Sequence, residues 1–295
     1  MTTGRPAIAA SFFQAPERVQ MMREAARRVM GPYAKVMIEQ AGLPPRHPRE
    51  QTLVVLDNAC GTGIVAETLY SMLDDESKET IRLTCGDTAG VMVQAASQSI
   101  QEFGWKGAEA RVVDAQNTGI ADDYLTHVLT NFGVQSMGES DKFLPECWRM
   151  LKSGGIIGLT SWQSTGWYDD FRGAFADIAD APQLPEQEAF FTARGARPPW
   201  HDVEYCEQQL HKQGFVDVEV KKVPFAGLVQ DVNDYWKSVA PMTILVTNWL
   251  WDEEQKKKFG PRIEPAVRKY VAEHYAAEKP FDTHWLAIVS TGRKP

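Results

Sequence analysis

Cysteine is scarce in this sequence, and the four cysteines present show no C-x-x-C spacing. We expect Cys60, Cys85, Cys147 and Cys206 to be reduced thiols rather than parts of a disulfide framework or a zinc site. The chain also has no run approaching the roughly 20 apolar residues that span a bilayer. Its first residues lack the apolar stretch of a secretion signal. We therefore expect a cytoplasmic protein with no bound metal and no membrane partner.

An excess of positive charge is absent as well. The formal net charge is −8 and the sequence pI is about 5.4, which argues against nucleic acid as the main partner because phosphate binding requires a basic surface. At 295 residues with 43% hydrophobic and 10% aromatic content, the chain is not disordered and can bury a full core. One large domain, or one domain with a lid, is expected, and the sequence carries no signal of an oligomeric state.

Strands and helices are expected to alternate over residues 52–161. Apolar runs predict strands, and apolar side chains at helical spacing between them predict helices. Such alternation produces βαβ units and a parallel sheet. We expect strands at 52–57, 81–85, 110–113, 125–132 and 155–161, and helices at 64–74, 89–103 and 139–151. Residues 151–162, LKSGGIIGLTSW, are expected to be a helix end, a Gly-Gly turn and a buried strand.

The remainder of the chain is expected to be mainly helical. Residues 16–42 have amphipathic helical character, and a proline-rich connector at 43–50 leads into the first strand. A helix at 202–213 precedes a strand at 215–223, and the last strand is expected at 283–294, so that the final strands form an antiparallel edge on a mostly parallel sheet. The expected organisation is a helical N-terminal extension at 1–48 and an α/β domain at 49–295 with cover insertions at about 163–200 and 225–280.

Residues 53–66, LVVLDNACGTGIVA, have the pattern of a strand, a glycine turn and a helix start. Gly61 and Gly63 permit positive φ angles and close approach of a ligand to the main chain. The free N–H groups in the first turn of the helix then face that ligand. The segment predicts a cradle for a nucleotide cofactor.

Two cofactors fit this cradle. The letters GTGIVA satisfy the dinucleotide pattern G-x-G-x-x-G/A, and Asp87 follows at roughly the 20-residue distance of that fingerprint. Asp57, at the end of the strand, would repel a pyrophosphate. A cofactor that carries a sulfonium and an ammonium group would instead be attracted by this carboxylate. The residues therefore favour S-adenosylmethionine over NAD(P).

Further candidates follow the other strands, because ligands of open α/β sheets bind outside the carboxyl ends of the strands. We expect Asp87 to accept the ribose hydroxyls, Met92 to lie against the adenine, Asp114 to reach the adenine amino group and Asn131 to lie beside the reacting methyl. The alternatives are that the acidic residues only cap the next helix and that Met92 only fills the core. The cofactor-binding candidates are Asp57, Asn58, Ala59, Cys60, Gly61, Gly63, Asp87, Thr88, Met92, Asp114, Ala115, Asn131 and Phe132.

Five segments carry the motifs described above: LDNACGTG (56–63), CGD (85–87), VVDA (112–115), THVLTNFG (126–133) and LKSGGIIGLTSW (151–162). Together they resemble class I S-adenosylmethionine-dependent methyltransferases and are similar, more narrowly, to fungal small-molecule methyltransferases of secondary metabolism, the group that contains the gliotoxin thiol-methylating enzyme. The resemblance covers about residues 50–162 well, and it implies a Rossmann-like class I methyltransferase sheet. It also implies that the glycine loop holds the methionyl part, Asp87 the ribose and Asp114 the adenine. Asn131 is not followed by the Pro-Pro of enzymes that methylate amino groups of nucleic acids and proteins, which disfavours those targets.

Catalysis of methyl transfer needs chiefly alignment and exclusion of water, and it needs a base only when a proton must leave the acceptor. His201, which follows RPPW, is the candidate base, and a structural role is its alternative. In similar enzymes the N-terminal extension folds over the site, so Tyr33 is a second catalytic candidate.

Aromatic side chains are concentrated in the expected cover segments, and an aromatic pocket suits a flat hydrophobic substrate. Ordinary helix core is the alternative for each single residue. The substrate-binding candidates are Gln135, Trp162, Trp167, Trp200 and Trp236.

The function predicted from the sequence is methylation of an oxygen or sulfur on a small, aromatic or polycyclic metabolite, with S-adenosylmethionine as the donor. One alternative is an NAD(P)-dependent oxidoreductase. That class has a Tyr-x-x-x-Lys pair on a central helix, whereas Tyr275 and Lys279 lie far beyond the cofactor half of the chain, so we expect this pair to be a chance match. Others are a regulatory relative that binds the cofactor without methylating, and a relative that uses the bound cofactor to promote a rearrangement.

Overall fold

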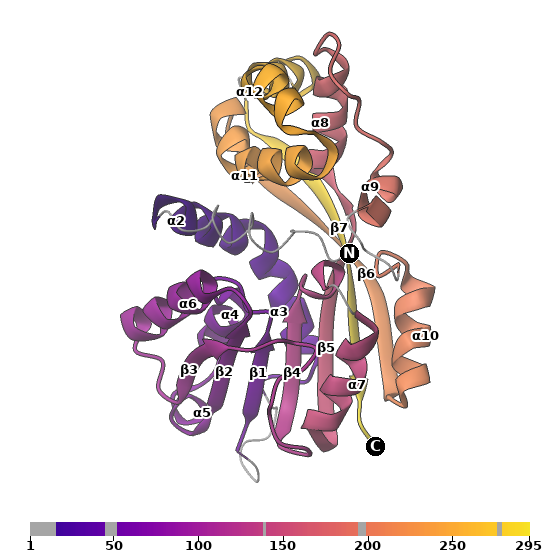
Figure 1. Cartoon of the computed structure of the whole chain (residues 1–295). Coiled ribbons are helices and arrows are strands. Elements are labelled where there is room, and N and C mark those ends of the chain that lie inside the picture. Colours follow the sequence, from indigo (N-terminus) through magenta and orange to yellow (C-terminus); the bar gives the residue numbers. More distant parts are fainter. Residues whose placement is uncertain (1–15, 45–51, 138–139, 194–198, 276–278) are drawn as a thin grey trace. The chain divides into compact units, whose positions relative to one another are not determined.

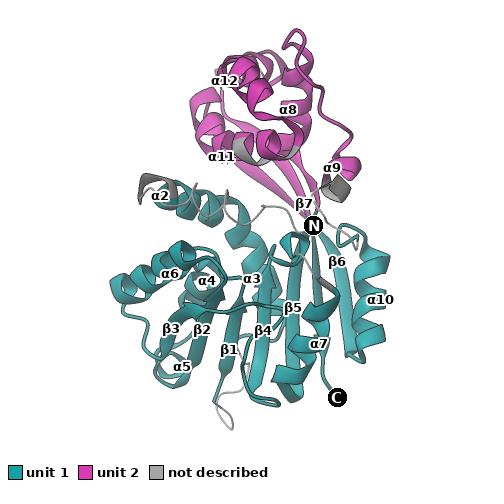
Figure 2. Cartoon of the chain, viewed as in Figure 1, with its two compact units in different colours: residues 1–162, 197–223, 287–295 teal, residues 163–196, 224–286 magenta. Residues whose placement is uncertain are grey.

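The computed structural model describes residues 16–44, 52–137, 140–193, 199–275 and 279–295. The chain divides into two compact units, shown in Figure 2. The first comprises Met1–Trp162, Arg197–Val223 and Ala287–Pro295, and the second comprises Gln163–Ala196 and Pro224–Leu286. Most of the proline-rich connector expected at 43–50, and the first residues of the extension expected at 1–48, lie outside the described residues.

One seven-stranded sheet has the order β3-β2-β1-β4-β5-β7-β6 (Figure 1). β1 pairs in parallel with β2 and with β4, β2 with β3, and β4 with β5. β7 enters the first unit from the second, whereas β5 and β6 leave the first unit for the second, so β7 supplies the antiparallel pairing at this edge. The mostly parallel sheet with one antiparallel edge is thus confirmed. The strands are β1 (Val54–Asn58), β2 (Arg82–Asp87), β3 (Ala108–Val112), β4 (Leu125–Asn131), β5 (Leu151–Thr165), β6 (Val216–Val229) and β7 (Phe281–Arg293).

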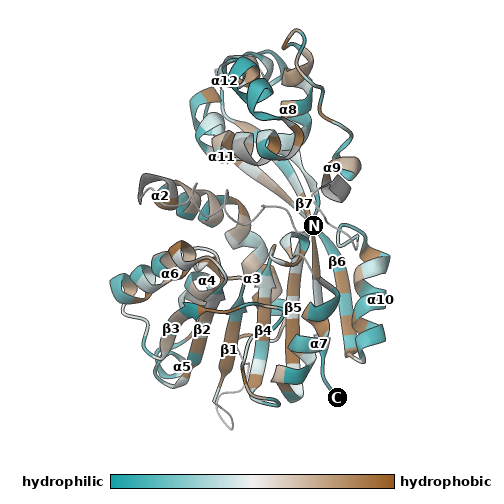
Figure 3. Ribbon diagram, viewed as in Figure 1, coloured by the Kyte–Doolittle hydropathy of each residue, from teal (hydrophilic) through white to brown (hydrophobic). Residues whose placement is uncertain are grey.

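Helices cover both faces of the sheet in the first unit, as the alternating sequence requires. Successive residues of a strand point to opposite faces, so Val55 belongs to a core cluster with Leu69 whereas Leu56 belongs to one with Phe143. The hydrophobic colour of the inner strands in Figure 3 follows from burial on both faces. The helices are α2 (Pro16–Ala25), η1 (Ala26–Met30), α3 (Gly31–Gln40), α4 (Ile64–Met72), α5 (Asp75–Thr80), α6 (Gly90–Phe103), η2 (Val134–Ser136), α7 (Ser140–Met150) and α10 (Val203–Gln213).

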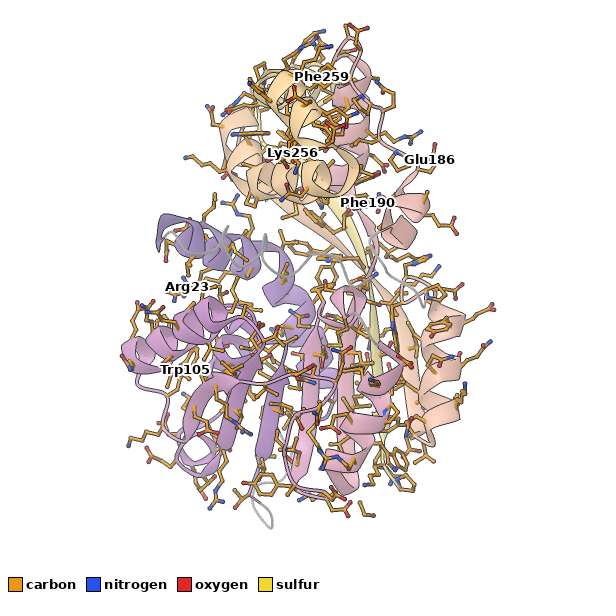
Figure 4. The ribbon with its side chains drawn as sticks, in the orientation of Figure 1. Arg23, Trp105, Glu186, Phe190, Lys256 and Phe259 are labelled. Atoms are coloured by element: carbon orange, nitrogen blue, oxygen red, sulfur yellow. The ribbon has the colours of Figure 1, made fainter. Side chains whose placement is uncertain are left out.

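The N-terminal helices α2, η1 and α3 are fastened to α4 and α6 by two arginines. Arg23, labelled in Figure 4, donates from Nη2 to the Ala95 carbonyl of α6 at 3.1 Å. Arg27 donates from Nε to Glu67 of α4 at 2.6 Å. Ordering long side chains costs entropy, but the Arg23 contact is buried, where a charge-assisted bond is worth more than on the surface. These contacts hold the extension against the helices that follow β1 and β2.

The second unit contains α8 (Gly166–Ala176), α9 (Gln187–Ala193), α11 (Val232–Leu250) and α12 (Glu253–Tyr275). A buried carboxylate joins three of them. Asp170 of α8 accepts from the phenol of Tyr235 of α11 at 2.5 Å and from that of Tyr275 of α12 at 2.9 Å. Burial raises the pKa of Asp170, and the two phenol donors oppose that rise. Both carboxylate oxygens of Asp170 therefore have a hydrogen-bond partner.

The structure differs from the sequence expectation at three elements. The Gly-Gly turn expected inside LKSGGIIGLTSW is part of β5, with Gly154 at φ 79° beside a register shift in the pairing with β4. Helix α5, a short polar helix with Asp74 as its N-cap, was not expected. β6 runs to Val229 rather than to residue 223.

Among the described residues, no helix is both long and apolar enough to cross a bilayer. In the same residues, no group of three or more His, Cys, Asp and Glu side chains is placed to hold a metal ion. Each of the four cysteines is a buried free thiol.

Candidate cofactor and active site

The loop between β1 and α4 has the backbone that the glycines predict. Gly61 has φ 54°, and Gly63, the N-cap of α4, has φ 90°. A Cβ added to Gly61 would meet nothing within 4 Å, so the main chain is open there. Ala59 adopts φ 58° without being glycine, a conformation that costs a non-glycine residue about 1 kcal/mol or more. The open backbone at Gly61 is where a ligand can approach the loop.

Asp57 is fully buried beneath this loop. Its Oδ2 accepts from the N–H of Ala66, in the first turn of α4, at 3.3 Å, and its Oδ1 has no hydrogen-bond partner among the described residues. Burial raises the pKa of Asp57 to about 8, with the nearby Asp87 contributing to the rise and the bond from Ala66 opposing it. Neither polar atom of the buried Asn58 side chain has a described partner. Buried polar groups normally have hydrogen-bond partners. The polar atoms of Asp57 and Asn58 that lack one are therefore available to bond a ligand at the end of β1.

Asp87 connects the two loops that would enclose a cofactor. Its Oδ2 accepts from the N–H of Gly61 at 2.9 Å, and its Oδ1 accepts from the N–H of Ala89 at 2.9 Å. Each carboxylate oxygen can accept a second bond, so Asp87 can still receive two hydroxyls. Thr88 is exposed, and Met92 is buried in the first part of α6.

Asp114 is exposed at the end of β3 and caps its own turn. Its Oδ1 accepts from the backbone N–H of Gln116 at 2.9 Å and from the Gln116 amide at 3.1 Å. Asp114 thus caps a turn rather than the start of a helix, since β4 is the next described element, and its role toward the adenine stays a prediction. Ala115 turns the other way and is buried in the core with Leu56.

Asn131 and Phe132 end β4 and are fixed by Thr160 of β5. The Thr160 hydroxyl donates to Asn131 Oδ1 at 2.6 Å, and its oxygen accepts from the N–H of Phe132 at 2.9 Å. Asn131 also donates from Nδ2 to the Met30 carbonyl of the N-terminal extension at 3.4 Å. Phe132 is held at φ 59°. Sequence reasoning did not select Thr160, although it lies in the GLTSW segment.

Three aromatic rings meet at this end of β4 and β5. Phe132 and Trp162 stack with ring centroids 3.8 Å apart and planes 10° apart. Tyr33 of α3 meets Phe132 edge-on at 5.5 Å and Trp162 edge-on at 5.4 Å. Burial raises the pKa of Tyr33 well above its ordinary value, so its phenol is neutral near pH 7. The structure thus brings together three residues that the sequence placed in different parts of the site.

Gln135 and Trp200 have buried positions with fixed partners. The amide of Gln135 is bonded at both ends to the backbone of Trp162, with Nε2 donating to its carbonyl at 3.0 Å and Oε1 accepting from its N–H at 2.6 Å. Trp200 packs in the core with Leu210, and its carbonyl accepts from the Ser161 hydroxyl at 2.5 Å. His201, the candidate base, follows it and is partly exposed.

The remaining candidate tryptophans belong to the second unit. Trp167 is 3% exposed and packs edge-on against Tyr168 and Phe171 of the same helix, with ring centroids 5.6 and 5.3 Å apart. Trp236 borders a cavity of about 420 Å³ between α11 and α12, and the Arg268 guanidinium lies 5.7 Å from its ring centre. A further cavity of about 330 Å³ in the first unit is lined by Tyr70, Phe103 and Trp105 and by none of the candidate residues.

Tyr275, of the Tyr-x-x-x-Lys pair, is one of the phenols that donate to Asp170 in the second unit. It belongs to a unit other than the one that holds the glycine loop. The structure therefore gives this tyrosine a packing role, as expected for a chance match to the oxidoreductase pattern.

Comparison with known proteins identifies the family. The model of the family described as "Methyltransferase domain" matches residues 55–155. The chain is 31% identical over 282 residues to methyltransferase ktnA of Aspergillus niger, with 89% of this chain and 91% of that protein covered. It is 30% identical over 276 residues to acetylaranotin bis-thiomethyltransferase of Aspergillus terreus, with 92% of each covered.

Solved structures agree on the fold. Phosphoethanolamine N-methyltransferase 2 of Haemonchus contortus, in complex with S-adenosyl-L-methionine, matches with a TM-score of 0.53 at 16% identity, covering 90% of this chain and 52% of that one. Identity at this level shows the fold alone. The two curated relatives show that the chain belongs to the class I S-adenosylmethionine-dependent methyltransferases, alongside the fungal enzymes of secondary metabolism.

Proposed function

We propose that this methyltransferase transfers the methyl group of S-adenosylmethionine to an oxygen or sulfur atom of a small hydrophobic metabolite. The observation that carries the proposal is that the open glycine loop, Asp87 and the Tyr33–Phe132–Trp162 rings all lie in one compact unit. The loop and Asp87 lie at the ends of β1 and β2, and Phe132 lies at the end of β4, which pairs with β1. An in-line transfer requires the methyl donor and the acceptor atom to be close together and aligned. Binding sites at adjacent strand ends provide that proximity.

The cofactor fits the residues present. Asp87 has acceptor capacity left for the two ribose hydroxyls, and the Gly61 backbone is open to a methionyl group. Asp57 and Asn58 offer unsatisfied polar atoms at the end of β1, and the Asp57 carboxyl is suited to positive charge. Met92 and Asp114 would contact the adenine. When bound, the cofactor supplies an electrophilic methyl on a sulfonium.

The acceptor side is apolar and dry. Tyr33, Phe132 and Trp162 are all at least nine-tenths buried, and a wall of such rings binds a flat hydrophobic molecule and excludes water. The N-terminal extension contributes Tyr33 to this wall, so we propose that it covers the site. The group that carries the reacting oxygen or sulfur would lie beside Phe132, at the end of β4.

The acceptor must lose a proton when it carries one. Burial raises the pKa of Tyr33 above its ordinary value, so we assign its phenol to the apolar wall rather than to the role of base. His201 is the proposed base. A thiol or phenol demands less of a base than an aliphatic alcohol, since its proton leaves more readily. The relative from Aspergillus terreus is named as a bis-thiomethyltransferase, which supports sulfur as one acceptor.

The test is a comparison of binding with turnover. We expect S-adenosylmethionine to bind the purified protein in calorimetry while NAD(P) does not, and panels of hydrophobic thiols and phenols to be methylated. Related methyltransferases that methylate members of the same panel serve as the control. If the protein binds S-adenosylmethionine but methylates no panel member, the non-methylating alternative is favoured instead.

A further inference from the structure

Gln135 holds the backbone of a single residue by both ends of its amide. Oε1 accepts from the N–H of Trp162 at 2.6 Å, and Nε2 donates to the carbonyl of the same residue at 3.0 Å. The side chain comes from η2, immediately after β4, and is 5% exposed. Two bonds to one residue fix both its position and its rotation about the strand axis, which one bond does not do.

Trp162 contacts both of the other rings of the aromatic cluster. Its indole stacks on Phe132 with planes 10° apart and receives the edge of Tyr33. Phe132 is fixed independently, by the bond from its N–H to Thr160. The backbone of each stacked ring is therefore held by a neighbouring side chain, Thr160 for Phe132 and Gln135 for Trp162.

Packing alone does not require an amide at position 135. An apolar side chain of similar size would fill the space, but it would leave the N–H and carbonyl of Trp162 without this partner, which is costly for buried backbone groups. The Gln135 amide also gives the Trp162 backbone a defined orientation. Its two bonds to Trp162 also leave it with limited capacity for a substrate.

We propose that Gln135 is a positioning residue that sets the Trp162 indole as the acceptor-facing wall of the site, and that it acts through Trp162 rather than by contacting the acceptor. The inference rests on the proposed function, because it assigns the aromatic rings to the acceptor side. It predicts that loss of the clamp weakens acceptor binding and leaves cofactor binding intact.

The second unit provides a matched control on the same strand. Gln187 makes the same pair of bonds to Thr165, with Oε1 accepting from its N–H at 2.6 Å and Nε2 donating to its carbonyl at 3.2 Å. Thr165 carries no ring. Comparing Gln135→Met with Gln187→Met therefore separates the effect on an aromatic wall from a general effect on β5.

The experiment measures acceptor KM, kcat, cofactor Kd by calorimetry and amide hydrogen exchange in both variants. For Gln135→Met we expect an acceptor KM raised about tenfold or more, a cofactor Kd within about twofold of the parent, and faster exchange at Trp162. For Gln187→Met we expect faster exchange at Thr165 and an unchanged acceptor KM. A third variant, Gln135→Glu, should regain acceptor affinity as pH falls, because only the protonated carboxyl can donate to the Trp162 carbonyl.

Three results would overturn the proposal. Gln135→Met could leave the acceptor KM unchanged, or it could weaken cofactor binding as much as acceptor binding. Gln187→Met could also raise the acceptor KM as much as Gln135→Met does. If the parent protein methylates no acceptor, the proposed function fails. The exchange data then decide the clamp separately, and unchanged protection at Trp162 in Gln135→Met contradicts it.

Discussion

The backbone N–H of Gly61 donates to Oδ2 of Asp87 at 2.9 Å, so the carboxylate expected to bind the ribose also ties the glycine loop to the end of β2. Its other oxygen holds the N–H of Ala89. One side chain thus sets the spacing of two cofactor loops and keeps lone pairs for the ligand. The double role explains why a single substitution there should affect the cofactor strongly.

We expect Asp87→Ala to weaken S-adenosylmethionine binding by at least about 30-fold, corresponding to about 2 kcal/mol, because it removes charged acceptors for ribose and unties the loop. Calorimetry measures the effect. The control is Asp74→Ala, which removes the N-cap bond to Ser77 of α5. The control should cost about 1 kcal/mol of stability and leave the affinity unchanged. A near-normal cofactor Kd in Asp87→Ala would refute the ribose assignment.

Gly61→Ala tests whether a ligand approaches the loop backbone. The added methyl meets no protein atom within 4 Å, at φ 54°. Gly104→Ala is matched to it, with φ 62° and equally open space after α6. Both should lose about 1 kcal/mol of stability from the left-handed backbone, as measured by denaturant unfolding. Only Gly61→Ala should also lose cofactor affinity, and equal affinities in the two variants would show that the cofactor lies elsewhere.

Cofactor binding should release a proton at Asp57. Because burial raises its pKa to about 8, the carboxyl is mostly protonated at pH 7 in the free protein. A sulfonium and an ammonium nearby favour the charged form and lower that pKa. Calorimetry in two buffers of different ionisation enthalpy should show release of up to one proton at pH 7, fading as pH rises through 8. Asp57→Asn should abolish the release. Equal binding enthalpies in the two buffers for the parent protein would place the positive charges away from Asp57.

His127 should make the protein less stable in mild acid. It is buried in β4 between the Thr126 hydroxyl and the Ala41 carbonyl, and burial lowers its pKa from 6.5 to about 4. Between those values the unfolded chain binds a proton that the folded chain does not, so stability falls as pH falls, by about 1.4 kcal/mol per unit. Urea unfolding should show a loss of about 2 kcal/mol between pH 6.5 and 5 from this group. His127→Gln should remove that part of the pH dependence, and an unaltered slope would mean that His127 already titrates normally.

The sequence predicted the parts of the fold that local chemistry dictates. β1, β2 and β4 are apolar runs and α6 has an apolar face, so their positions were expected within a few residues. Gly154 misled the expectation because a positive φ is compatible with a turn as well as with an irregular strand, and the pairing of β5 with β4 decides between them. Asp74 signals a helix start, but the six residues of α5 are too few for an apolar period.

The residues of the candidate site that lie at or directly after the end of a strand could be predicted from the sequence. Asp57, Asp87 and the glycine loop lie together because parallel strands end at one edge. Long-range partners were not predictable: nothing local indicates that Gln135 bonds the Trp162 backbone or that Trp200 packs in the core. Tyr33 was placed from the resemblance, and its contact with Phe132 depends on the packing of the whole extension.

The most direct test of the account is incubation of the protein with S-adenosylmethionine labelled in its methyl group and with matched hydrophobic substrates that present a thiol, a phenol or an amine. Mass spectrometry locates the label. The account predicts a labelled S-methyl or O-methyl product and unlabelled amines, with the signal lost in Asp87→Ala. Label found on nitrogen, or no labelled product although the cofactor binds, would contradict it.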